Sequence, residues 1–141
     1  MKRLALATAA SLALGLAPAL ADDTGMTAIE WELLAIDGTF TDMPATLRFD
    51  ESGRITGRAP CNRWFASNTA ALPAIQLSPI GSTKRACDRL ADEHIYLRAL
   101  AGMQTAALDG DNLILTGADG HSMEFVREVM NSLTRCKTCA P

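Results

Sequence analysis

The chain has 141 residues, with 13 Lys and Arg against 16 Asp and Glu, and a formal net charge of −3. This length suits one domain and argues against two. The acidic balance argues against nucleic acid or anionic lipid as a partner, because both require a basic surface.

Residues 1–21 have the features of a signal peptide. Met1-Lys2-Arg3 is a basic start, an apolar run extends from Leu4 to Leu16, and Ala19-Leu20-Ala21 fits a cleavage site. The run is shorter than the roughly 20 residues that a spanning helix needs, so no membrane span is expected. Removing this segment leaves 11 basic and 16 acidic residues over 120 positions, a charge of −5. We therefore expect a periplasmic protein, secreted through a cleaved signal peptide.

The next segments have the patterns of antiparallel strands. Residues 28–36 alternate, so that Trp31 and Leu33 share one face, and Asp37-Gly38 follows as a turn. Leu47–Phe49 and Arg54–Arg58 are predicted to form a hairpin through a turn that contains glycine.

After this hairpin, Pro60 ends strand pairing, and Cys61–Trp64 is interpreted as a loop. Residues 71–80 are extended but interrupted by Pro73 and Pro79, which predicts an edge position.

One helix is predicted, from about Lys84 or Asp88 to Ala101, and Gly102 should end it. Three residues are candidates for its N-cap: Ser82, Thr83 and Asp88. A spacing of 100° per residue places five residues on its inner side, Cys87, Leu90, His94, Leu97 and Ala101, with Glu93 and Leu100 flanking them. Three strands should follow, at 104–108, 113–116 and 121–126, joined by turns rich in Asp and Gly.

The order of these motifs resembles the META domain family, which includes the bacterial envelope heat-shock protein HslJ. The matching residues are Trp31-x-Leu33, Leu47-x-Phe49-Asp50-x-x-Gly53-Arg54-x-x-Gly57, Cys61-Asn62-Arg63, Thr83-Lys84-Arg85-Ala86-Cys87, Glu93-x-x-Tyr96, Leu113-x-Leu115 and Met123-Glu124-Phe125. The resemblance covers about residues 27–127. Pro60 departs from it, because the family usually has Gly before the signature Cys.

The resemblance implies a compact α+β domain. We expect a mostly antiparallel sheet, curved and barrel-like, with one main helix at about residues 84–101. The expected organisation is a signal peptide at 1–21, a META-like domain at 22–127 and a C-terminal tail at 128–141. The family motif residues are Cys61, Asn62, Arg63, Thr83 and Cys87.

Four cysteines lie in the exported part, and an even number in an oxidising compartment favours disulfides. The Cys136-x-x-Cys139 spacing has several interpretations: a tail disulfide, free or intermolecular thiols, a metal site or a redox motif. The resemblance places Cys61 and Cys87 in one domain, so we expect Cys61–Cys87 and Cys136–Cys139 pairs. The first pair requires Cα atoms within roughly 7 Å.

The residues that could carry out chemistry are better explained by structural roles. Asn62 and Arg63 could be an oxyanion donor and an anion clamp, but no nucleophile or base accompanies them, so we favour loop hydrogen bonds and ion pairing or stacking. His94 is interpreted as a packing residue. The histidine spacing and the Asp109–Asn112 turn fit neither a zinc site nor an EF-hand. No catalytic, cofactor or metal residue is assigned.

Two functions remain open. One is a non-enzymatic envelope-stress or antibiotic-tolerance role, through binding an unidentified protein partner or a small apolar ligand. The other is a small hydrolase or inhibitor with a site near the Cys61–Trp64 loop. We favour the first.

Overall fold

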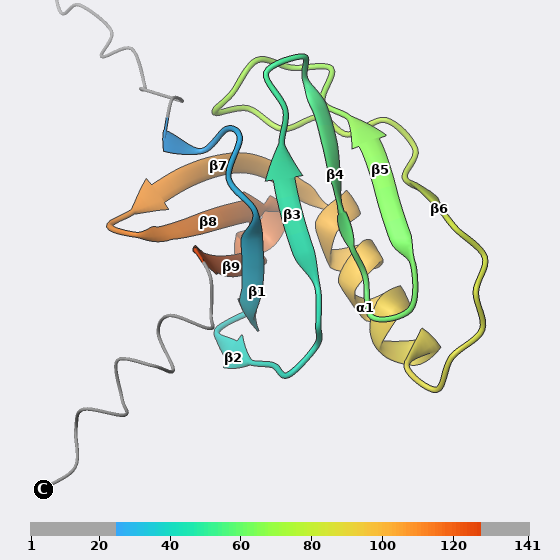
Figure 1. Ribbon diagram of the computed structural model, residues 1–141. Coiled ribbons are helices and arrows are strands. Elements are labelled where there is room, and N and C mark those ends of the chain that lie inside the picture. The colour runs from blue at the N-terminus through green and yellow to red at the C-terminus, as the bar shows by residue number, and fades with distance from the viewer. Residues whose placement is uncertain (1–24, 128–141) are drawn as a thin grey trace, which may run out of the picture.

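The computed structural model describes residues 25–127 (Figure 1). The expected signal peptide (1–21) and the tail with Cys136 and Cys139 lie outside the described residues. The elements in chain order are β1 (Trp31–Ile36), β2 (Thr39–Phe40), β3 (Thr46–Phe49), β4 (Arg54–Arg58), β5 (Arg63–Ser67), β6 (Gly81–Ser82), α1 (Leu90–Ala101), β7 (Met103–Asp109), β8 (Asn112–Gly117), the short 3-10 helix η2 (Ala118–Gly120) and β9 (Ser122–Arg127).

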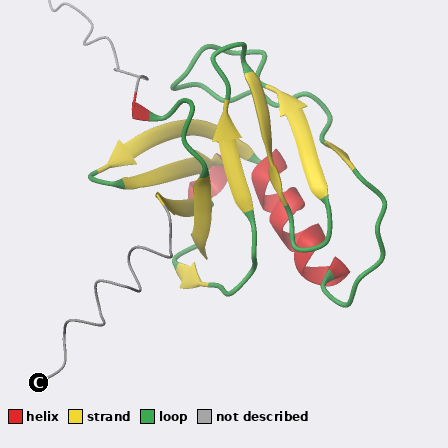
Figure 2. Cartoon of the chain, viewed as in Figure 1, coloured by secondary structure: helices red, strands yellow, loops and turns green. Residues whose placement is uncertain are grey.

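The strands form one antiparallel sheet in the order β6-β5-β4-β3-β1-β9-β8-β7, and β2 pairs with β1 at its end. Figure 2 shows the main helix behind the strands of the β3–β5 half. The α+β class with one main helix is therefore confirmed. The sheet is open, with β6 and β7 at its two ends, so the barrel-like closure is not observed. Within residues 25–127, no helix is long and apolar enough to cross a bilayer.

The core is built from the inward-facing residues of the strands, which alternate with residues that face outward. Trp31, Leu33 and Ala35 of β1 are buried, whereas the residues between them are half-buried, so this strand has the period of two that its sequence predicts. Five aromatic residues are buried in the core: Trp31, Phe49, Trp64, Tyr96 and Phe125.

A close backbone approach at Gly57 joins β3 to β4. A Cβ atom at this position would lie within van der Waals overlap of the Thr46 carbonyl oxygen and of the Trp64 indole nitrogen. Only glycine leaves room for Trp64 Nε1 to donate a hydrogen bond to Thr46 O, at 3.2 Å.

Two extended segments differ from the prediction. Arg63 and Trp64, interpreted as loop residues, begin strand β5, in which Trp64 and Ala66 are buried and the alternate residues are exposed. Pro60 ends one strand, but the chain re-enters the sheet three residues later. Residues 71–80 form no strand and contribute isolated bridges, one of which joins Ala74 to Thr105 of β7.

The helix starts later than predicted and presents another face. It begins at Leu90, and Arg89 occupies the N-cap without a side-chain capping bond. Its buried residues are Glu93, Tyr96 and Leu100, whereas His94 is exposed, so the packing role expected for His94 is wrong. The Cys87 residue is likewise exposed. The buried face of the helix is therefore rotated from the predicted face, because hydrogen bonds to a distant loop hold Glu93 inside the protein.

Candidate functional site

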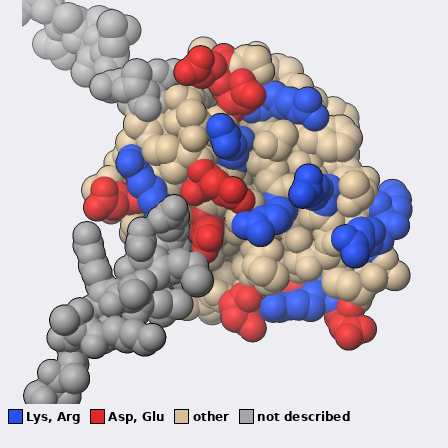
Figure 3. All heavy atoms as spheres, in the orientation of Figure 1, with Lys and Arg blue, Asp and Glu red and all other residues tan. Residues whose placement is uncertain are grey.

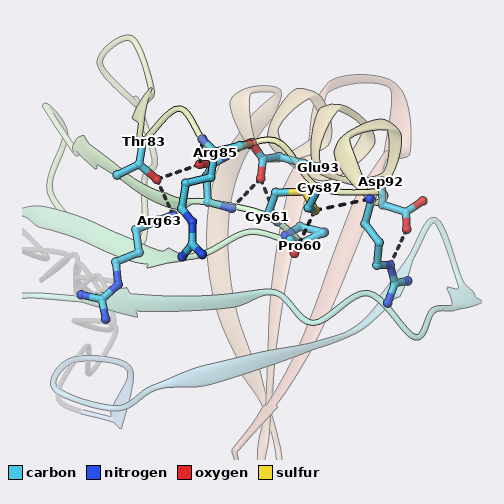
Figure 4. The surroundings of a disulfide bond; sticks show 10 residues. Pro60, Cys61, Arg63, Thr83, Arg85, Cys87, Asp92 and Glu93 are labelled. Atoms are coloured by element: carbon cyan, nitrogen blue, oxygen red, sulfur yellow. Dashed lines mark hydrogen bonds and ion pairs between the residues drawn. A yellow bond between two sulfur atoms is a disulfide. The ribbon is translucent and has the colours of Figure 1, made fainter.

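The Cys61-Asn62-Arg63 motif lies where the β4–β5 connection, the segment before α1 and the helix itself meet (Figure 4). The structure contains the expected Cys61–Cys87 disulfide, with Cα atoms 5.8 Å apart. This bond fixes the segment before the helix against the start of β5.

Asn62 is the centre of this junction. Its side chain is buried, with 6% of its surface exposed. Its Oδ1 atom accepts hydrogen bonds from the Thr83 hydroxyl at 2.8 Å and from the Arg85 backbone N–H at 2.7 Å. Its Nδ2 atom donates to Arg85 O at 3.2 Å and to Glu93 Oε1 at 2.8 Å. One side chain therefore joins its own loop to the segment of Thr83 and Arg85 and to the helix.

Glu93 is the buried partner of this asparagine, with 4% of its surface exposed. Its Oε2 atom accepts from the backbone N–H groups of Asn62 and Cys61, at 2.8 and 3.0 Å. The carboxylate thus has three N–H donors and, within the described residues, no cationic partner. Buried polar groups contribute to stability when their hydrogen bonds are made. The cluster of Asn62, Thr83 and Glu93, with the disulfide, is called the polar junction below.

The sequence interpretation placed Glu93 at the flank of the inner helix side but missed its role as a buried hydrogen-bond acceptor. The Glu93-x-x-Tyr96 spacing was visible as part of the family resemblance, but no pattern in the chain pairs Glu93 with the loop amides. Its partners are 31 and 32 positions away, and a helical periodicity weighs only neighbouring positions.

Thr83 and Arg63 lie side by side as backbone partners. Thr83 Oγ1 accepts from Arg63 N at 3.2 Å, and Arg63 O accepts from Thr83 N at 3.0 Å. The Arg63 side chain is exposed and extends away from the disulfide (Figure 4). It makes no ion pair with any residue between 25 and 127, so the expected acid partner is not observed. The Arg63 side chain belongs to the outer face of the sheet, beside its cross-strand partner Arg58.

Tyr96 and Trp64 complete the inner side. The Tyr96 hydroxyl and the Trp64 indole both donate to Thr46 O, at 3.0 and 3.2 Å, and the two rings pack edge to face. Burial raises the pKa of the Tyr96 phenol well above its ordinary value, so the group stays protonated and serves as a donor.

A second feature is an apolar cavity of about 370 Å³ beside the end of α1. Ile36, Ile95, Ala99 and Met103 contribute its apolar lining. Four charged or titratable residues also line it: Asp37, Arg98, Asp119 and His121. Asp37 and His121 are 3.1 Å apart from Oδ2 to Nδ1. Asp37 Oδ1 also accepts from Ser122 N at 2.9 Å, and this bond, together with His121, holds the pKa of Asp37 below its usual range.

These observations define the class: a small α+β domain whose open antiparallel sheet is fastened to one helix by a buried Asn-Glu pair and a disulfide. A sequence model of the META domain matches residues 24–130, and the chain belongs to the META domain family. Comparison with curated proteins gives no match.

Solved structures share the fold. An NMR structure of a protein from Burkholderia xenovorans is 21% identical, covers 87% of this chain and 99% of its own, and superposes with a TM-score of 0.59. A crystal structure of a DUF4847 family protein from Bacteroides vulgatus is 11% identical, covers 75% of this chain and 96% of its own, and also gives 0.59. At these identities the likeness concerns the fold alone.

Proposed function

We propose that this META-domain protein is an exported, non-enzymatic envelope protein that binds a small apolar ligand, in an HslJ-like stress or antibiotic-tolerance role. The cavity beside α1 carries the proposal. Its volume of about 370 Å³ falls within the usual range for small-molecule sites, and a lining of apolar walls with a small number of polar groups is typical of them.

The polar junction supports a non-enzymatic role. The groups that a hydrolase near Cys61–Trp64 would need, the Asn62 amide and the Glu93 carboxylate, are already bound to each other and to backbone groups. An oxyanion donor or general base has to be free to contact a substrate. The motif is therefore better suited to holding the fold than to reacting.

Ligand binding can be tested with a neutral fluorescent probe such as N-phenyl-1-naphthylamine. Ala99 lies on the cavity wall, so Ala99→Phe should fill the cavity and reduce probe affinity by about tenfold or more. Ala91→Phe adds the same side chain to an exposed position of the same helix and should leave affinity unchanged. Equal binding by both variants would overturn the cavity assignment.

Export is tested separately. The leader pattern predicts a mature protein that starts at Asp22 in the periplasmic fraction. N-terminal mass mapping of protein from cell fractions checks this, and retention of residues 1–21 or recovery with the membrane would contradict it. Turnover of an ester substrate that survives Ala99→Phe but is lost in Arg63→Gln, whose exposed side chain the fold does not require, would favour the hydrolase alternative.

A further inference from the structure

We infer that the outer face of β3, β4 and β5 is a second binding site, which takes a soluble ring compound carrying two or more phosphate groups. This face is separate from the apolar cavity and does not depend on its having a ligand. A hollow of about 710 Å³ lies over these strands. Its lining includes Arg48, Arg54, Thr56, Arg58, Arg63 and Phe65.

The strand register explains how four arginines come together. Arg48 on β3 pairs with Thr56 on β4, and Thr56 pairs with Phe65 on β5, so these three residues form a row across the sheet. Arg54 and Arg58 lie two positions before and after Thr56 and therefore on the same face. All four arginines are exposed. Figure 3 shows Lys and Arg side chains gathered over this part of the molecule.

This clustering opposes folding. Arg58 and Arg63 are direct cross-strand partners, and like charges in that position destabilise a sheet. The chain as a whole is acidic, at −3, so a general excess of basic residues does not explain the patch. Glu30 pairs with Arg58 at 3.1 Å, which leaves three of these arginines without an ion pair among residues 25–127. A multivalent anion would offset their mutual repulsion.

The side chains indicate the class of ligand. A guanidinium group offers paired donors that match the oxygens of phosphate, and a phosphate can accept from several arginines at once. By strand geometry, Arg54 and Arg58 are about 13 Å apart along β4, a span that suits two or more anionic groups better than one. Phe65 is 49% exposed, and its ring lies against Gly81 with the Arg54 guanidinium 5.8 Å from its centre. The exposed part of this ring adds an apolar surface to the hollow, against which the ring of a ligand can pack.

Two other anionic partners fit less well. A bilayer is flat and extended, whereas these arginines line a hollow. A nucleic acid is a long polyanion that would also meet the acidic remainder of the surface. A compact ligand contacts the patch alone.

The test is titration calorimetry of the full chain with inositol hexakisphosphate at low salt. Removing one charge-assisted contact should weaken binding about tenfold in Arg48→Gln and in Arg63→Gln. Arg98→Gln removes the same charge at an exposed position of α1 that borders the apolar cavity and does not line the hollow, so phosphate affinity should stay within about twofold. The melting temperature of Arg63→Gln should equal or exceed that of the wild type, because the variant relieves its repulsion with Arg58.

An equal loss of affinity in Arg98→Gln would overturn the proposed site, because the probe would then respond to the net charge of the protein and not to the arginines of the hollow. Citrate or single-stranded DNA binding as tightly as the phosphate probe would also overturn it, as would binding only to vesicles that contain phosphatidylinositol bisphosphate. Amide shift mapping of the wild type is independent of variant folding. Probe-induced shifts confined to β3–β5 support the inference, and shifts centred on α1 contradict it.

Discussion

Asn62 and Arg63 are adjacent in the chain, but the Asn62 side chain is inside the protein and the Arg63 side chain is in solvent. The Asn62 side chain is buried and makes four hydrogen bonds, and each of its polar atoms is used. The Arg63 side chain is exposed and has no ion pair among residues 25–127. The comparison teaches that one sequence motif serves two purposes: its first two residues hold the helix to the sheet, and its third joins a surface suited to an anion.

The largest effect is expected from removing the centre of the polar junction. Asn62→Ala leaves the Arg85 N–H and the Thr83 hydroxyl without their acceptor, and Glu93 loses a donor. The buried Glu93 carboxylate should lose about 1–3 kcal/mol with its donor, and the two partly buried bonds about 1 kcal/mol each, so the free energy of unfolding should fall by about 4 kcal/mol. Urea unfolding followed by tryptophan fluorescence measures this change.

Arg63→Ala is the matched control for that experiment. It changes the next residue of the same motif, whose side chain is exposed, and should alter stability by less than about 0.5 kcal/mol. If the two variants lost similar stability, the division between an inner and an outer half of the motif would be wrong.

The disulfide is the next largest contributor to the junction. Cys61 and Cys87 close a loop of 26 positions, so the Cys61→Ser, Cys87→Ser double variant should lose about 3 kcal/mol. Thermal unfolding with and without a reductant checks this, because the reduced wild type should match the double variant. Cys139→Ser, in the tail, should barely change stability. A wild type that reductant does not affect would contradict a structural role for this bond.

A smaller effect is expected deeper in the core. Tyr96→Phe removes one hydrogen bond to Thr46 O, which keeps the bond from Trp64, so the loss should be about 1 kcal/mol. His94→Gln lies on the exposed side of the same helix and should change stability by less than about 0.5 kcal/mol. Chemical unfolding of both variants compares the two sides of α1, and a larger loss in His94→Gln would reverse the assignment of its faces.

Much of the sheet could be predicted from the sequence, because its signals are local. Trp31 and Leu33 alternate with half-buried residues, and Asp37-Gly38 marks a turn that the structure contains. The expected face of the helix was wrong because Glu93, a charged residue, is buried by contacts with a distant loop. The cluster of arginines on the outer face of β3, β4 and β5 was also missed. Its members come from three strands, and only the register brings them together.

The exposed hydrogen bonds of Asp37 can be compared with the buried hydrogen bonds of Asn62. Asp37 accepts hydrogen bonds from Ser122 N and His121, as Asn62 does from its own partners, but it lies on the surface. These contacts lower the pKa of Asp37, the Ser122 bond most of all. A group whose pKa is lower in the folded state stabilises the fold above its unfolded pKa, and this contribution is lost as pH falls through the folded pKa.

Asp37→Asn tests this with little disturbance of the backbone, since asparagine tolerates the positive φ of 49° at this position. We expect the wild type to be slightly more stable than the variant above about pH 5, and the difference to close as pH falls below about 4. Urea unfolding of both proteins across this range measures the difference directly, and carboxylates that titrate in both proteins cancel from it. The difference should also be the smallest of the series, because water competes for exposed hydrogen bonds and salt screens exposed charges. A gap that widened on acidification would mean that the pKa of Asp37 is raised. A gap as large as that of Asn62→Ala would remove the distinction between buried and exposed polar contacts on which the comparison rests.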